Sequence, residues 1–168
     1  MKKLVIVGLL AVVTVFGAFA NDFVSPAAGV DLTAKVDKFL DLTVPADYTA
    51  TDIAQSAETG ATAYSWSIGN VVVKSNMNNW QISLSSANDG VLKTTVDSVD
   101  YTIGYTVTLG TLLSTPTSLA TDWTSAAQSK TAKGGVTNAL AVAFTSSATE
   151  FYQAGTYSDT ITVTVIEP

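Results

Sequence analysis

Apolar residues recur at every second position along several short segments of this chain, which is the period of half-buried β-strands and not of helices. Polar turns and loops separate the segments, and no stretch shows a helical period. About seven strands are expected, in residues 39–44, 64–73, 80–84, 91–96, 101–109, 140–144 and 157–165. The pattern predicts an all-β fold, an immunoglobulin-like β-sandwich. Its nearest rival is a jelly roll, which needs an eighth strand.

Local features add detail to this pattern. The apolar parity slips at Gly69 and Asn70, which indicates a bulge or a tight bend. The sequence "ANDG" at 87–90 favours a tight hairpin turn. Trp80 shares the parity of its apolar neighbours and is expected in the core. Residues 114–135 are rich in Ser, Thr and Ala, so we expect a loop there with at most a short strand.

A further alternating segment precedes these strands, with its apolar residues at Val30, Leu32, Ala34 and Val36. A single strand from Val30 to Val44 would be about 50 Å long at about 3.3 Å per residue, against about 20 Å for an ordinary strand. We therefore expect a hinge at Asp37 and Lys38. The segment before the hinge then either adds as a strand to a neighbouring molecule or pairs as the first strand of its own domain.

The chain ends on the most regular alternation of all, "DTITVTVIEP". Ile161, Val163 and Val165 fall on one face, and threonines fall on the other. No Pro or Lys interrupts residues 156–166, although edge strands usually carry such residues to prevent association. We therefore expect this strand to lie in the centre of a sheet.

The residues available for chemistry are few, because the chain contains no His, no Cys and no Arg. It thus lacks the imidazole base and the thiolate on which many catalytic sites depend. Its carboxylates are scattered, and a hydrolase that uses two of them, such as Asp97 and Asp100, is the weakest interpretation. No loop has the Asp-x-Asp-x-Asp-Gly spacing of a calcium site. We expect no catalytic residue, no metal and no cofactor.

Residues 1–20, "MKKLVIVGLLAVVTVFGAFA", have the basic start, the apolar run and the small-residue end of a secretory signal peptide. The expected organisation is a signal peptide at 1–20, an N-terminal extension and candidate donor strand at 21–37, and a sandwich domain at 38–168. We expect export to the periplasm and then to the cell surface or the extracellular space, with no integral membrane segment in the mature chain. Losing Lys2 and Lys3 takes the net charge from −6 to −8, which disfavours nucleic acid as a partner.

Trp123 lies in the loop-like region, within "LATDWTSAAQ". An exposed tryptophan offers a face on which a sugar ring stacks, whereas a tryptophan packed on the core anchors its loop. The alternative function is therefore a self-contained extracellular binding module for glycans, with Trp123 as the ligand contact.

Both ends of the mature chain resemble known families. The ending "AGTYSDTITVTV" resembles the closing strand of the spore coat protein U family and related fimbrial subunits, in which Gly-x-Tyr, here Gly155 and Tyr157, precedes an alternating C-terminal strand. The opening "VDLTAKVDKFLDLTV" resembles that of CS1 and CFA/I-type pilins, where a short strand, a hinge and a second strand follow one another. Spore coat U relatives usually carry cysteines, and this chain has none.

The resemblance implies donor-strand complementation, in which an incomplete immunoglobulin fold receives the N-terminal strand of the next subunit. It implies a non-enzymatic structural subunit of a surface fibre or coat. The partners would be copies of this chain or related subunits, with a periplasmic chaperone and an outer-membrane usher during assembly. The donated side chains would be Val30, Leu32, Ala34 and Val36, and Gly155 and Tyr157 would have structural roles.

Overall fold

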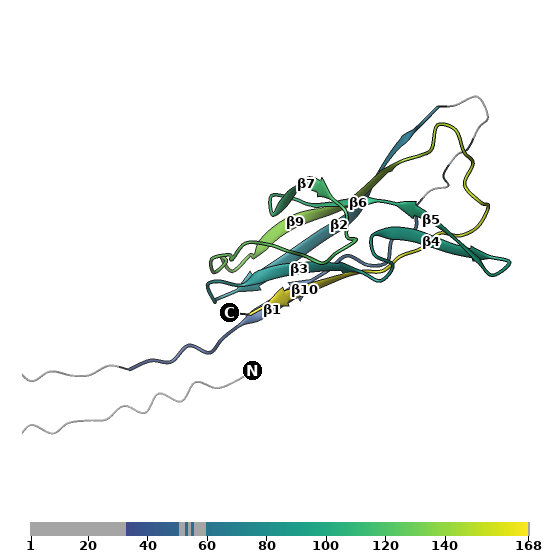
Figure 1. Cartoon of the computed structure of the whole chain (residues 1–168). Coiled ribbons are helices and arrows are strands. Elements are labelled where there is room, and N and C mark those ends of the chain that lie inside the picture. Colours follow the sequence, from purple (N-terminus) through teal and green to yellow (C-terminus); the bar gives the residue numbers. More distant parts are fainter. Residues whose placement is uncertain (1–32, 51–52, 54, 56–59, 168) are drawn as a thin grey trace, which may run out of the picture. The chain divides into compact units, whose positions relative to one another are not determined.

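A computed structural model describes residues 33–50, 53, 55 and 60–167. A compact unit begins at Val36 and holds every described strand (Figure 1). The expected signal peptide lies outside the described residues, as do Val30 and Leu32 of the candidate donor strand.

The described residues form ten strands and no helix. Their bounds are β1 Leu40–Thr43, β2 Ala63–Ser75, β3 Gln81–Ser86, β4 Val91–Val96, β5 Val99–Gly104, β6 Thr106–Leu109, β7 Leu113–Thr117, β8 Trp123–Thr124, β9 Val136–Thr145 and β10 Ile161–Ile166. The number exceeds the expected seven for two reasons. The segment 101–109 divides at Tyr105 into β5 and β6, and the region expected to be mainly loop contributes β7 and β8.

The strands form two facing sheets and a projecting hairpin. One sheet has the order β1-β2-β9-β6-β7, the other has the order β10-β3-β8, and β4 pairs with β5 (Figure 1). In an immunoglobulin domain, strands A, B, E and D form one sheet, and strands C, F and G form the other. By this scheme β1, β2, β9 and β6 correspond to A, B, E and D, and β3 and β10 correspond to C and F.

The core confirms the predicted alternation. Its fully buried side chains come from the inner faces of β2, β3, β6 and β9, and include Val71, Val73, Ile82, Leu84 and Leu109. Trp80 is also buried, as expected, and its indole N–H donates to the carbonyl oxygen of Ser129 at 2.8 Å. The fold is therefore the predicted all-β sandwich of immunoglobulin type.

Two local predictions about the strands were wrong. Residues 87–90 do form a turn, but it does not close a hairpin, because β3 pairs with β10 and β8 while β4 pairs with β5. The final strand β10 is not central, because it pairs with β3 on one side and lies at the end of its sheet within the described residues. Strand alternation shows that one face is buried, but it carries no information on how many neighbours a strand has.

The predicted bulge in β2 is confirmed, since the register between β2 and β9 shifts between Ser67 and Gly69. Gly69 has a φ of +145°, and a Cβ atom placed on it would lie 2.7 Å from Cβ of Pro45. The absence of a side chain thus lets the segment after β1 pack directly against β2. This contact positions one wall of the site described below.

We predict that Gly69→Ala lowers the free energy of unfolding by about 1–3 kcal/mol, because it combines an unfavourable φ with a clash against Pro45. Urea denaturation of the variant and the unmodified protein measures this difference. Gly104→Ala is the matched control, since a Cβ there meets no atom within 4 Å. Equal losses in the two variants would contradict the role assigned to Gly69.

Candidate functional site

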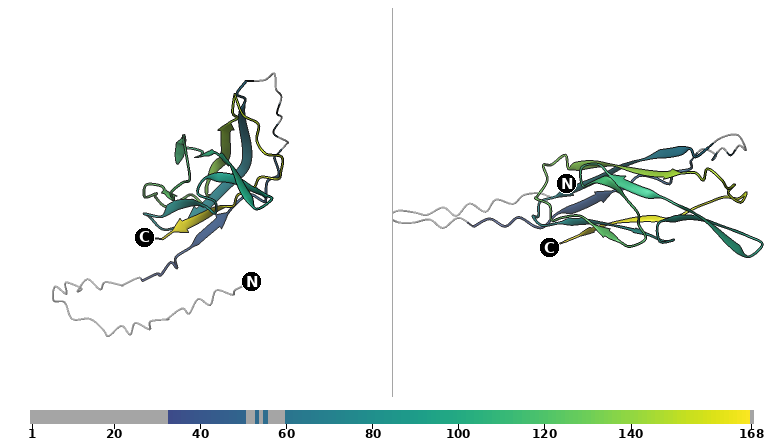
Figure 2. Two further views of the ribbon diagram at one scale, coloured as in Figure 1. Left: turned by 45° about the vertical axis from the view of Figure 1, so that its right-hand side comes forward. Right: turned by 45° about the horizontal axis from the view of Figure 1, so that its top comes forward.

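The two sheets are open along one side, between β1 and β10. Each of these strands lies at the end of its sheet, and the two run in opposite directions along the same side of the sandwich (Figure 2). Their inward apolar residues are only half-buried: Leu40 and Leu42 on β1, and Ile161, Val163 and Val165 on β10. Two of their cross-strand partners are fully buried, since Leu42 pairs with Val73 and Val163 pairs with Leu84.

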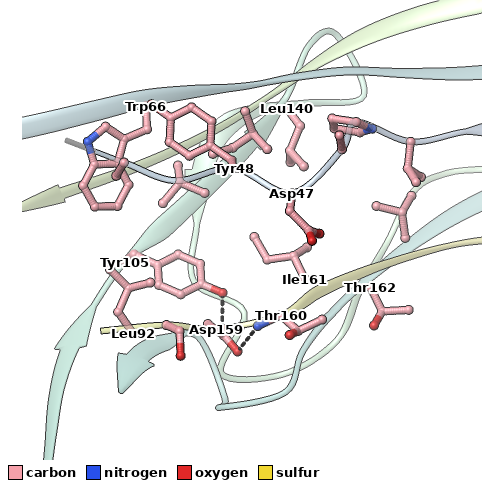
Figure 3. Close-up of a pocket in the computed structure, with 18 of the residues that line it drawn as sticks. Asp47, Tyr48, Trp66, Leu92, Tyr105, Leu140, Asp159, Thr160, Ile161 and Thr162 are labelled. Atoms are coloured by element: carbon pink, nitrogen blue, oxygen red, sulfur yellow. Dashed lines mark hydrogen bonds between the residues drawn. The ribbon is translucent and has the colours of Figure 1, made fainter. Parts of the chain in front are cut away.

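A groove of about 530 Å³ occupies this open side. The segment after β1 and the inner face of the larger sheet form one wall, and β10 with the residues before it forms the other (Figure 3). The lining residues are Val44, Pro45, Ala46, Asp47, Tyr48, Ala50, Trp66, Ile68, Leu92, Tyr105, Leu140, Val142 and Tyr157 to Val163. The groove is thus mainly apolar, with aromatic rings at the end where β10 begins.

The free edge of β10 presents hydrogen-bonding groups to this groove. The carbonyl oxygen of Thr160 accepts from the backbone N–H of Ala87 at 3.0 Å, so the Thr160–Ala87 pair is hydrogen-bonded across to β3. In an antiparallel ladder such pairs alternate along the strand. Thr162 and Thr164 therefore direct their backbone groups toward β3. The N–H and C=O groups of Ile161, Val163 and Val165 therefore point away from β3, toward the open side of the sandwich.

The free edge of β1 has the same character. The backbone N–H of Asn76 donates to the carbonyl oxygen of Phe39 at 3.2 Å, which fixes that pair as hydrogen-bonded. By the same alternation, Leu40 and Leu42 direct their backbone groups away from β2. Each of the two edge strands thus offers main-chain donors and acceptors from the residues whose side chains are half-covered. Such an edge suits an added β-strand.

The carboxylate of Asp159 fixes the start of β10. Its Oδ2 accepts from the hydroxyls of Tyr105 at 2.5 Å and Ser86 at 2.6 Å, and its Oδ1 accepts from the backbone N–H groups of Thr160 at 2.7 Å and Asn88 at 3.0 Å. Figure 3 shows the bonds from Tyr105 and Thr160. Ser86 Oγ in turn accepts from the N–H of Gly90 at 2.6 Å. The network ties β10 to the 87–90 turn, which holds this wall of the groove in place.

Burial raises the pKa of Tyr105 above its usual value, and the hydrogen bond to the Asp159 carboxylate raises it further. The neutral hydroxyl is the form that donates to the carboxylate, so the shift reflects the network itself. Burial also raises the pKa of Tyr157, with smaller contributions from Tyr101 and Tyr152.

Two of the four predicted donor residues are among the residues that the structure describes. Val30 and Leu32 lie outside the described residues, Ala34 is exposed and precedes the compact unit, and Val36 is its first residue and is exposed. The described residues thus include two of the four side chains, and both are exposed. The hinge predicted at Asp37 and Lys38 lies just before β1.

The Gly155-x-Tyr157 motif forms a turn before β10. The Tyr157 hydroxyl donates to the carbonyl oxygen of Gln153 at 3.0 Å, four residues earlier. A tyrosine bonded to the backbone upstream of strand F is a feature of immunoglobulin-type sandwiches. A Cβ atom on Gly155 would lie 2.7 Å from Oγ1 of Thr94, so this turn packs closely on β4.

Trp123 does not stand free in a loop. It forms β8 with Thr124, pairs with Leu84 of β3, and its half-buried side chain packs against the core. This placement matches the role of a packing anchor, which leaves less of the ring for a sugar.

Asp97 and Asp100, the acidic residues considered for a hydrolase, do not have the setting of a catalytic pair. Asp97 and Asp100 lie in and beside the β4–β5 turn. Asp100 accepts from Lys93 Nζ at 2.6 Å and from the Thr95 hydroxyl at 2.6 Å, and these bonds lower its pKa. A general acid needs the opposite shift. In the described part of the chain, no group of three or more Asp and Glu residues is placed to hold a metal ion, and no helix is suited to cross a membrane.

Sequence reasoning missed the groove and the Asp159 network. The network joins residues up to 73 positions apart, and no spacing rule in the sequence connects them. The only available signal was an aspartate directly before a strictly alternating strand.

Comparison with known protein families, curated proteins and solved structures found no match to this chain. The fold and the groove are therefore the basis for a functional assignment.

We predict that Tyr105→Phe flattens the dependence of stability on alkaline pH. The raised pKa means that the folded protein holds the Tyr105 proton more tightly than the unfolded chain does, so this contribution is complete below about pH 10 and is lost as the pH rises further. The variant also loses about 1.5–3 kcal/mol at neutral pH, because a hydrogen bond to a charged acceptor is removed. Denaturation of both proteins at a series of pH values tests this. Parallel profiles above pH 10 would refute the assigned role of the hydroxyl.

Proposed function

We propose that this chain is a secreted structural subunit of a bacterial surface fibre or coat, which assembles when the N-terminal strand of one copy adds to the groove of another. The observation that carries the proposal is the open side of the sandwich. Among the described residues, the outer edges of β1 and β10 pair with no strand, and they flank apolar side chains that are only half-covered.

The topology supports a missing strand. Strand G of an immunoglobulin domain pairs with strand F, on the side away from strand C. Here β10 corresponds to F, and its outer edge pairs with no strand among the described residues. An added strand at this edge would pair with β10 and complete the second sheet. Its inward side chains would cover Ile161, Val163 and Val165.

The N-terminal segment has the composition that such a strand needs. Its apolar residues Val30, Leu32, Ala34 and Val36 alternate with polar ones. The alternation matches β10, where Ile161, Val163 and Val165 are spaced by two residues. A slip of one residue would turn polar side chains into the groove, so the pattern also fixes the register. The segment lies before the compact unit, which begins at Val36.

The absence of reactive side chains is compatible with a structural role, and the resemblance of both chain ends to donor-strand pilins supports the same proposal. Handling by a periplasmic chaperone and an outer-membrane usher belongs to the proposal as well. Nothing observed at Trp123 favours the glycan-binding alternative, since its ring packs partly on the core.

We predict that a peptide of residues 28–38 binds the chain that begins at Val36 and raises its thermal unfolding midpoint. The peptide supplies the apolar face and the main-chain partners that the groove lacks. A peptide carrying Leu32→Asp is the control, because it places a charge among apolar side chains and should not bind. Isothermal titration calorimetry and thermal denaturation measure both effects.

The acceptor side offers a matched pair of variants. Val163 lines the groove, and Thr164 is exposed on the opposite face of β10 and does not line the groove. Val163→Asp should abolish peptide binding, whereas Thr164→Asp should preserve it. Binding of the Leu32→Asp peptide with unchanged affinity, or equal effects of the two variants, would overturn the proposed assembly.

A further inference from the structure

Four of the large exposed apolar side chains lie toward the two ends of the sandwich. At one end, which we call the base, Val36 is 84% exposed and Phe39 is 53% exposed. Both residues lie just before β1. At the other end, which we call the aromatic end, Tyr48 is 43% exposed and Phe151 is 67% exposed. Figure 2 shows the segments that carry these two pairs at opposite ends of the strands.

Asn76 fixes the base. This residue lies in the turn between β2 and β3, and it makes three hydrogen bonds to the chain just before β1. Its side-chain Nδ2 donates to the carbonyl oxygen of Asp37 at 2.8 Å, and its Oδ1 accepts from the N–H of Phe39 at 2.8 Å. Its own N–H donates to the carbonyl oxygen of Phe39 at 3.2 Å. The backbone at the predicted hinge is thus anchored, so Phe39 is displayed at a defined position.

The aromatic end rests on packed rings. Tyr48 lies 6.5 Å from Trp66, and Trp66 lies 5.1 Å from Phe144, measured between ring centroids. Beside them, the residue that follows Phe151 is bonded to the neighbouring loop, since the N–H of Tyr152 donates to Oε1 of Gln55 at 2.5 Å. Tyr48 and Trp66 also line the groove, so the aromatic end continues the surface of the proposed strand site.

The short link between strand and domain decides which surfaces meet. If residues 30–36 lie in the groove of another copy, only 37–39 separate them from their own β1, a reach of about 10 Å. The base of the donor copy must therefore lie at the end of the acceptor's groove where the donated strand comes out. At the end near Ile166, the acceptor's own base already occupies that position, because Ile166 pairs with Gln81 close to the Asn76 turn. The other end of the groove is the aromatic end.

We propose that the base of one copy packs against the aromatic end of the next, with Phe39 and Phe151 in a second interface between consecutive copies of this chain. This inference rests on the proposed function, because strand donation is what brings the two ends together. The contact joins two different surfaces, so it repeats head-to-tail from one copy to the next. Exposed aromatic side chains are suited to carry the energy of such a contact.

The test measures polymer size in the full-length protein, recovered after export and examined by sedimentation velocity. Phe39→Ser and Phe151→Ser should each give polymers several-fold smaller than those of the unmodified protein. The double variant should reduce polymer size by no more than the sum of the two single reductions, and by an amount closer to either one alone. The reason is that the effects of two residues in one contact are not additive. Phe39→Leu and Phe151→Leu are matched controls that keep an apolar surface and should retain most of the polymer size.

The peptide of residues 28–38 separates this inference from the proposed function. The two serine variants, made in the chain that begins at Val36, should bind the peptide with unchanged affinity and keep their thermal midpoints. Polymers of ordinary size from both serine variants would overturn the second interface and leave strand donation standing. Failure of the peptide to bind the unmodified domain would instead remove strand donation, and the second interface with it.

Discussion

The constraint on which the rest of this structure depends is that the outer edges of two strands, β1 and β10, pair with no other strand in the part of the chain that the structure describes. Strand β10 directs the backbone groups of Ile161, Val163 and Val165 away from its sheet, and β1 does the same with Leu40 and Leu42. The same residues carry the side chains that cover the core incompletely. Hydrogen-bonding capacity and apolar surface therefore coincide along one side of the sandwich, and a single extended strand would satisfy both.

Other parts of the fold hold this side open in a fixed shape. The Asp159 carboxylate binds the start of β10 to the 87–90 turn, and the missing side chain of Gly69 lets Pro45 pack against β2. Asn76 anchors the backbone where the N-terminal segment leaves the domain. A preformed groove and an anchored exit lower the entropic cost of assembly, because neither has to be ordered when a strand arrives.

Much of the fold could be predicted from the period of apolar residues, since a period of two reports a half-buried strand directly. This is why the core side chains, the β2 bulge and the two-faced final strand were correctly placed. The neighbours of each strand could not be predicted, because pairing depends on contacts between distant residues. The 87–90 turn looked like a hairpin and β10 looked central for this reason. The groove depends on how β4 and β10 pair, so it could not be predicted from the sequence either.

The most direct test is amide hydrogen exchange along β10, resolved by residue, in the chain that begins at Val36. The amides of Thr162 and Thr164, which face β3, should exchange slowly with or without the peptide of residues 28–38. Those of Ile161, Val163 and Val165 should exchange quickly in the domain alone and slowly once the peptide is added. Slow exchange at these three amides without any peptide would show that the edge is already paired, and would contradict an incomplete sandwich.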